Sequence, residues 1–202
     1  MNAAHILVAG MAVACLAACG SSSTVEDRYY SLVLAAGSAS AAADEGAPTL
    51  IVGPIELPRY LGGRGLSMQV GPNQIETANH HFWAEPLDEA IAKVLVRDIA
   101  EQTDQFNVER ESGRWSGNED CRVRIDFDAF HPTHQSEVVV RGRYWVISGE
   151  SSDRADFSLG RELTRDGYAN AVDELRRVLQ TLAGDISRSV AACATDDGSA
   201  TH

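Results

Sequence analysis

Leu16-Ala17-Ala18-Cys19 is the stretch of this sequence whose residue types and spacing are best suited to chemistry. Small residues directly before a cysteine form the pattern of a bacterial lipobox, the signal for attaching lipid to that cysteine. The preceding residues 6–18 are almost all apolar or small; a bilayer span needs about 20 apolar residues, so this run fits the core of a signal peptide instead. We therefore predict that residues 1–18 are a signal peptide and that Cys19 is lipidated.

The alternative for this region is a buried N-terminal helix that contains an ordinary cysteine. Residues 20–24 disfavour it, because Gly20 and the serines after it form a flexible spacer where a core helix would continue. Residues 19–27 are thus expected to tether a folded domain to a membrane, stably, because a lipoprotein cysteine carries more than one acyl chain. Gly20 stands where an Asp commonly retains such proteins at the inner membrane, so we expect the periplasmic face of the outer membrane.

Two further cysteines, Cys121 and Cys193, remain once the signal peptide and the anchor are set aside. In an oxidising compartment such a pair can close a disulfide, which here would join the start of a predicted strand to the end of the last helix. Two separate thiols are the alternative. A metal site on this pair is disfavoured, since neither residue lies in a Cys-x-x-Cys or Cys/His cluster.

Two histidine pairs could suggest metal binding, namely His80-His81 and His131-x-x-His134. Neighbouring residues of an extended chain point to opposite sides, and the second pair lies in a predicted loop that contains a proline. Neither pair has nearby cysteines or the helical His-x-x-x-His spacing of a zinc site. We therefore predict no metal site.

Asp126 and Asp128 share one face of a predicted strand and could work together in acid–base catalysis. Their alternation with Arg122 and Arg124 favours a solvated ladder of charges instead. The sequence has neither a Gly-x-Ser-x-Gly elbow nor a phosphate-binding glycine loop, so we predict no catalytic residue and no cofactor. Trp115, in a polar loop, is the best single candidate for an exposed contact.

The composition is that of a globular domain with an acidic surface. The hydrophobic fraction is 44%, and the net charge of −12 comes without a basic cluster, which disfavours nucleic acid as a partner. After residue 19 no apolar run is long enough to cross a membrane. We expect one domain over residues 28–193 and a polar tail over 194–202.

The hydrophobic pattern predicts strands and two helices within this domain. Residues 121–130 alternate most regularly, as in an antiparallel sheet with one wet face. Apolar stripes predict helices over residues 85–102 and from Tyr168 to Val190. Pro54 places its strand at a sheet edge or at a break. The fold class we predict is α+β, a mainly antiparallel β-sheet with two long amphipathic helices packed on one face. Further strands are expected at residues 28–34, 49–57, 65–70, 74–78, 106–109, 137–147 and 156–163.

Several segments together resemble the PqiC-type lipoproteins, also called ABC-transport auxiliary lipoproteins. The resemblance spans nearly the whole mature chain, and the combination of segments is specific although each one is short. The Cys121/Cys193 pair and the length of the loop at residues 35–48 depart from the family pattern. The segments that carry the resemblance are Tyr29-Tyr30-x-Leu32, Val52-Gly53-Pro54-Ile55-Glu56-Leu57-Pro58-Arg59-Tyr60-Leu61, Phe82-Trp83-Ala84-Glu85-Pro86-Leu87-Asp88, the strand pair at 121–147, and Asp166-Gly167-Tyr168.

The resemblance implies a non-enzymatic docking subunit of an MCE-type lipid transport system. Its implied partners are an MCE-domain protein, the membrane through the lipid anchor, and further copies of itself in a ring. The sheet edge near Pro54 and the turn at residues 60–63 are candidate contact surfaces. The alternative is a lipoprotein that itself carries a lipid or solute; it would need an apolar cavity of several hundred Å³, which we do not expect because the sheet covers the helix stripes. A periplasmic hydrolase is a third hypothesis, supported only by scattered His and Asp residues.

Overall fold

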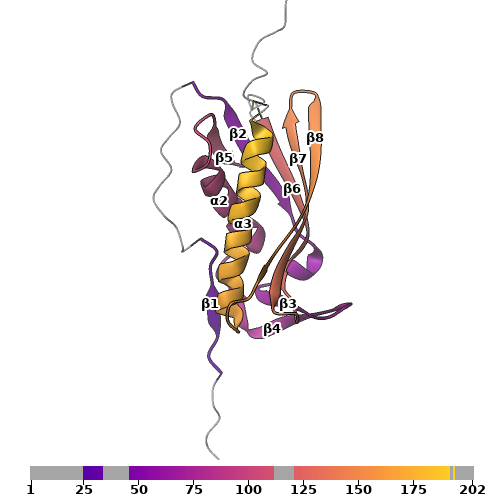
Figure 1. Ribbon diagram of the computed structural model, residues 1–202. Helices are drawn as coiled ribbons and strands as arrows, with labels where there is room; N and C mark the ends of the chain where they lie inside the picture. Colours follow the sequence, from indigo (N-terminus) through magenta and orange to yellow (C-terminus); the bar gives the residue numbers. More distant parts are fainter. Residues whose placement is uncertain (1–24, 34–45, 112–120, 192, 194–202) are drawn as a thin grey trace, which may run out of the picture.

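The computed structural model describes residues 25–33, 46–111, 121–191 and 193 (Figure 1). Within these residues, strands make up most of the regular structure, and two α-helices accompany them. In chain order the elements are β1 (Arg28–Tyr30), β2 (Thr49–Glu56), the 3-10 helix η2 (Arg59–Leu61), β3 (Gly65–Gly71), β4 (Gln74–Trp83), α2 (Leu87–Ala100), β5 (Asn107–Arg110), β6 (Cys121–Pro132), β7 (Glu137–Ser148), β8 (Ser151–Glu162) and α3 (Tyr168–Val190).

The strands form two sheets. The larger has the order β5-β2-β6-β7-β8, in which β6, β7 and β8 are antiparallel neighbours while β2 is parallel to both β5 and β6. The smaller has the order β1-β4-β3, with β1 parallel and β3 antiparallel to β4. The α+β class is confirmed, but the prediction of one mainly antiparallel sheet is wrong, because both sheets are mixed.

The connections of the chain explain the parallel pairs. Helix α2 carries the chain back before β5, and such a crossover lets β5 lie parallel to β2. With β5 on one side and β6 on the other, β2 has no free edge over Leu50–Val52 for the β3–β4 hairpin, which forms its own sheet. The pairing of β2 with β5 ends at Val52, so Pro54 lies where β6 is the only strand beside β2 among the described residues. Pro54 also marks a break, because the pairing of β2 with β6 shifts register between Val52 and Ile55.

Both helices cover the same face of the five-stranded sheet, as predicted (Figure 1). Helix α2 packs against β2 and β5, and α3 runs along β6, β7 and β8. The two stripes enclose one continuous core with the inward face of β6. The described helices include none long and apolar enough to cross a membrane. The buried stripe residues are Leu87, Ile91, Val94, Leu95 and Ile99 in α2, and Val172, Leu175, Leu179, Leu182, Ile186 and Val190 in α3.

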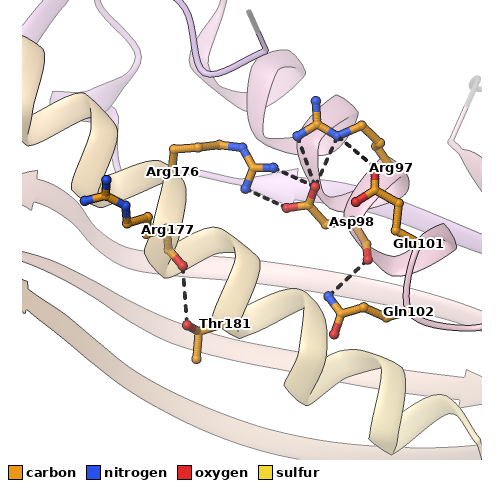
Figure 2. Close-up of polar contacts among 7 residues, drawn as sticks. All are labelled: Arg97, Asp98, Glu101, Gln102, Arg176, Arg177 and Thr181. Atoms are coloured by element: carbon orange, nitrogen blue, oxygen red, sulfur yellow. Dashed lines mark hydrogen bonds and ion pairs between the residues drawn. The ribbon is translucent and has the colours of Figure 1, made fainter. Parts of the chain in front are cut away.

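The two helices are also joined by a buried polar cluster around Asp98 of α2, which is 1% exposed (Figure 2). Arg176 of α3 reaches it with two nitrogens, Nη1 at 2.6 Å from Oδ2 and Nη2 at 2.7 Å from Oδ1. Arg97 donates to Oδ1 through Nη2 at 3.0 Å, and the Gln102 side chain donates to the Asp98 carbonyl at 3.0 Å. This two-point contact fixes how α2 sits on α3.

Gly142 lets β7 approach its neighbours closely. A Cβ added there would lie 2.2 Å from the Asp126 carbonyl oxygen and 2.8 Å from the Phe157 ring. No other residue fits this position without moving β6 or β8. Strand β8 itself extends beyond the predicted 156–163, because its exposed polar first half pairs with β7 from Ser151 onward.

Candidate functional site

The predicted cysteine and tryptophan sites fall partly outside the described residues. Cys19 and Trp115 lie outside them. Cys121 and Cys193 are joined by a disulfide, with their Cα atoms 6.0 Å apart. This bond connects the first residue of β6 to the chain just after α3, so it links the C-terminal end of the longest helix to the sheet.

The structure does not bring the histidines together. His80 Nδ1 lies 2.9 Å from Asp27 Oδ1, and His81 Nδ1 lies 2.7 Å from the Tyr30 hydroxyl, so both hold the N-terminal segment against β4. His131 is buried and its Nδ1 donates to the Pro132 carbonyl at 3.1 Å, whereas His134 is exposed. Within the described residues, no group of three or more His, Cys, Asp or Glu side chains could hold a metal ion.

Burial sets the protonation of two of these histidines. Desolvation lowers the pKa of His131, and the nearby Arg141 charge lowers it further, against the opposing effect of the hydrogen bond to Pro132. Desolvation also lowers the pKa of His81, with smaller contributions in the same direction from Arg28 and His80. Both rings are therefore favoured in the neutral form, which suits the packing of His131 beside Tyr60 at a ring-centroid distance of 5.9 Å.

Asp126 and Asp128 form ion pairs with different arginines on the outer face of the sheet. Asp126 Oδ1 lies 3.2 Å from Nε of Arg124, and Asp128 Oδ2 lies 2.8 Å from Nη2 of Arg143. A register shift between Phe127 and Ala129 further separates their surroundings. The geometry is that of a charge ladder and does not pair two carboxylates around a substrate.

A groove of about 520 Å³ opens where the two sheets meet the start of α2. One wall comes from the end of β2 and the turn after it, and the other from the junction between β4 and α2. Its most buried lining residues are Leu61, Trp83 and Leu87. The full lining is Ile55, Leu57, Leu61, Gly62, Gly63, Arg64, Trp83, Ala84, Glu85, Pro86, Leu87 and Asp88.

Short backbone contacts position the two walls. In the first, Leu61 N–H donates to the Pro58 carbonyl at 2.9 Å, which closes the turn of η2. The walls are joined where Trp83 N–H donates to the Arg64 carbonyl at 2.7 Å. Pro86 stands at the N-cap of α2, where its missing N–H leaves no helix bond unmade. The groove is thus formed by fixed backbone and does not depend on side-chain rotamers alone.

The rim of the groove is charged, while its floor is apolar. Arg64 is exposed at one side, and its guanidinium carbon lies 5.7 Å from the centre of the Phe82 ring. On the other side Glu85 forms an ion pair with Lys93, and Asp88 lies in the first turn of α2. Such a groove can receive an apolar side chain or chain segment and select its charged neighbours.

The sequence did not predict a groove at this position. The helix stripes are covered by the sheet, as the sequence indicates, but the groove opens beyond the ends of the stripes. Sequence reasoning named the turn at residues 60–63 and missed its partner at residues 83–88. The available signal was that the resemblance to the family includes both residues 52–61 and residues 82–88, although these segments are well separated in the chain.

Residues 30–187 match the family described as the ABC-type transport auxiliary lipoprotein component. The match covers well over half of the chain, and the chain therefore belongs to this family.

Relatives of known name agree with this assignment. The chain is 26% identical over 176 residues to the intermembrane transport lipoprotein PqiC of Escherichia coli K12, covering 87% of this chain and 91% of the relative. The protein of the same name from Shigella flexneri matches equally. A solved structure of an uncharacterized protein has a TM-score of 0.71 at 23% identity, over 82% of this chain and 99% of its own. The crystal structure of a protein from Xanthomonas campestris has a TM-score of 0.61 at 14% identity, and the match covers 79% of this chain and 95% of that chain. These two structures share the fold.

Proposed function

We propose that this chain is a non-enzymatic docking subunit of an MCE-type intermembrane lipid transport system, anchored at the periplasmic face of the outer membrane. Residues 1–18 are the signal peptide, Cys19 carries the lipid, residues 19–27 form the tether, and residues 28–193 form the docking domain, followed by the tail at 194–202. The family membership and the names of the relatives support the transport role. In this reading the disulfide between Cys121 and Cys193 forms after export to an oxidising compartment.

The observation that carries the proposal is the meeting of two segments in one groove. Residues 52–61 and 82–88 both carry the family resemblance, and both contribute walls to the groove of about 520 Å³. A surface that family members use for a common partner would be built from such shared segments. The apolar floor and charged rim fit a segment of the MCE protein that inserts an apolar side chain between polar neighbours.

Two matched substitutions test the groove. Ala84→Arg places a long charged side chain in the groove at an exposed position, and Ala191→Arg makes the same change at an exposed position after α3. We expect Ala84→Arg to lower recovery of the MCE protein in pull-downs from membranes by about tenfold, the effect of about 1.4 kcal/mol at an interface. The Ala191→Arg variant should retain wild-type recovery.

Each outcome of this pull-down has a separate meaning. If the wild-type chain recovers no MCE protein, the proposed function is wrong. If both variants recover it equally well, docking occurs elsewhere and the groove assignment is wrong. Sedimentation velocity of the purified lipoprotein in detergent tests the ring separately, which requires a single oligomeric species.

The anchor has its own test. We expect the mass of the mature protein to correspond to residues 19–202 plus acyl chains, and Cys19→Ser to release the protein from membranes. A Cys19→Ser protein that still sediments with membranes would contradict lipid anchoring at this residue.

A second candidate function is the binding of a lipid or solute by this domain itself. The groove volume of about 520 Å³ favours it, because ligand pockets commonly enclose about 300–1,000 Å³. Native mass spectrometry of the wild-type chain distinguishes the two. Co-purified phospholipid that Ala84→Arg removes would favour cargo binding, and bare protein with retained MCE docking would favour the docking subunit.

A further inference from the structure

Two of the three exposed large apolar side chains of the described residues lie close together in the sequence, at the N-terminal end of the described domain. Val25 is 64% exposed and Tyr29 is 56% exposed, and both belong to the segment that begins the folded domain. The third, Ile75, is 37% exposed and lies at the other end of β4, beside the β3–β4 turn. Among the described residues, neither the five-stranded sheet nor the two helices contribute such a side chain. An exposed apolar surface of this kind marks a contact with another phase or partner.

The exposed tyrosine is held in a built cluster. Tyr29 pairs with Phe82 in the parallel register of β1 and β4, and their ring centroids are 5.6 Å apart. The guanidinium carbon of Arg64 lies 6.0 Å from the Tyr29 ring and 5.7 Å from the Phe82 ring. Arg64 thus sits beside two aromatic rings, and no carboxylate of the described residues forms an ion pair with it. Tyrosine rings and arginine side chains are the groups that lie at the headgroup level of membranes.

The chain on the N-terminal side limits what can lie opposite this cluster. Cys19 is six residues before Val25, so a fully extended tether spans about 20 Å. The domain is longer than that, since the 23 residues of α3 alone extend about 35 Å. Figure 1 shows β1 at one end of the molecule and the turn between β7 and β8 at the other. With lipid on Cys19, the end that bears Val25 and Tyr29 must stay close to the bilayer.

We propose that Val25, Tyr29, Phe82 and Arg64 form a membrane-contact surface that rests on the phospholipid bilayer. Val25 and Tyr29 enter the headgroup region, and the Arg64 guanidinium binds lipid phosphates beside them. The short tether keeps the local concentration of lipid high, so a weak contact is enough to orient the domain. Arg64 also lines the groove, so one side of the groove lies beside this surface. This inference rests on the proposed lipid anchor at Cys19.

The test uses the full lipidated chain in vesicles of phosphatidylethanolamine and phosphatidylglycerol, with and without bromine on the acyl chains. Bromine quenches tryptophan that reaches the membrane. Tyr29→Trp places the probe in the cluster, and Glu150→Trp places a matched probe in the exposed turn between β7 and β8. After subtraction of the wild-type signal, we expect the probe at position 29 to lose about half of its emission in brominated vesicles, as a ring at interfacial depth would. The probe at position 150 should keep its emission.

A third variant asks whether the cluster itself makes the contact. Val25→Ser and Arg64→Gln, added together to Tyr29→Trp, should reduce the quenching, while circular dichroism shows that the domain remains folded. Protein that floats with the vesicles but shows no quenching at position 29, or equal quenching at positions 29 and 150, would overturn the membrane-contact surface alone. Protein that fails to float would overturn the lipid anchor and this inference with it.

Discussion

Asp98 offers the sharpest test of how the two helices are held together. Its carboxylate is 1% exposed and receives two nitrogens of Arg176 from the other helix (Figure 2). We consider Asp98→Asn, which keeps the shape of the side chain and removes the charge. Arg97 retains Glu101 as a neighbour, with Nε at 3.9 Å from Oε1, but Arg176 has no second carboxylate among the ion pairs of the described residues. The substitution therefore leaves one cation, with a side chain only 14% exposed, without its counter-charge.

The expected cost follows from that burial. Removing one partner of a buried ion pair costs about 3–5 kcal/mol, because the remaining charge is neither solvated nor neutralised. We expect the free energy of unfolding of Asp98→Asn, measured by urea denaturation, to fall by this amount. Asp185→Asn is the matched control on α3, since its partner Arg188 has a side chain 75% exposed. The loss of such an exposed pair should cost at most about 1 kcal/mol.

A double substitution separates the ion pair from general damage at this position. In Asp98→Leu with Arg176→Met, both charges leave together and the interior stays filled. The single variants Asp98→Leu and Arg176→Met each lower the free energy of unfolding by some amount. We expect the double variant to lose at least about 1 kcal/mol less than the sum of these two losses, because residues in contact are coupled by energies of this size. Strict additivity, or a cost for Asp98→Asn no larger than that for Asp185→Asn, would refute the assignment of Asp98 and Arg176 as the charged link between α2 and α3.

Three further predictions concern the sheet, a histidine and the disulfide. Gly142→Ala should lower the free energy of unfolding by at least about 1–3 kcal/mol, because its Cβ would meet the Asp126 carbonyl oxygen at 2.2 Å; wild-type stability in urea would contradict the close approach of β7 to β6. The pKa of His131 is lower in the folded protein than in the unfolded chain, so as the pH falls the unfolded chain binds the proton first. The free energy of unfolding therefore falls as the pH drops below the unfolded pKa of about 6.5, and it is unaffected by this residue above that pH. His131→Gln should therefore show a shallower fall of stability between pH 7 and 5, and an unchanged slope would contradict burial of a neutral ring. Replacing Cys121 and Cys193 with Ser, or reducing the wild-type protein, should each cost about 2–5 kcal/mol of unfolding free energy, and no effect of reductant would indicate two separate thiols.

The sequence was informative wherever one side of an element is buried. The alternation of residues 121–130 correctly indicated which side of β6 faces the core, because Val123, Ile125 and Phe127 are buried and the charged residues between them are not. The two helical stripes were equally clear. In each case the buried face produces a hydrophobic periodicity in the sequence, and this periodicity is recognisable without knowing which element covers the face.

The identity of the strands that pair with one another produces no such periodicity. A strand such as β2 has the same apolar composition whether its neighbours are parallel or antiparallel, so the mixed sheets could not be derived from it. The need for glycine at position 142 is also invisible, since it depends on the Asp126 carbonyl sixteen residues away in the sequence. The groove was missed for the same reason: its walls are two short irregular segments whose meeting is decided by the fold of the small sheet.

Strand β1 supports one wall of the groove through its contacts with the end of β4. The Tyr30 carbonyl accepts a hydrogen bond from Ala84 N–H at 2.8 Å, and the Tyr30 hydroxyl lies 2.7 Å from His81 Nδ1, so β1 supports the wall that carries Trp83. The same wall is joined to Arg64 by a backbone bond of 2.7 Å. These three contacts place the N-terminal strand and the turn that carries Arg64 on the same wall of the groove, at the end of β4. The position of this wall therefore depends on the pairing within the small sheet, which is why the groove could not be derived from either segment alone.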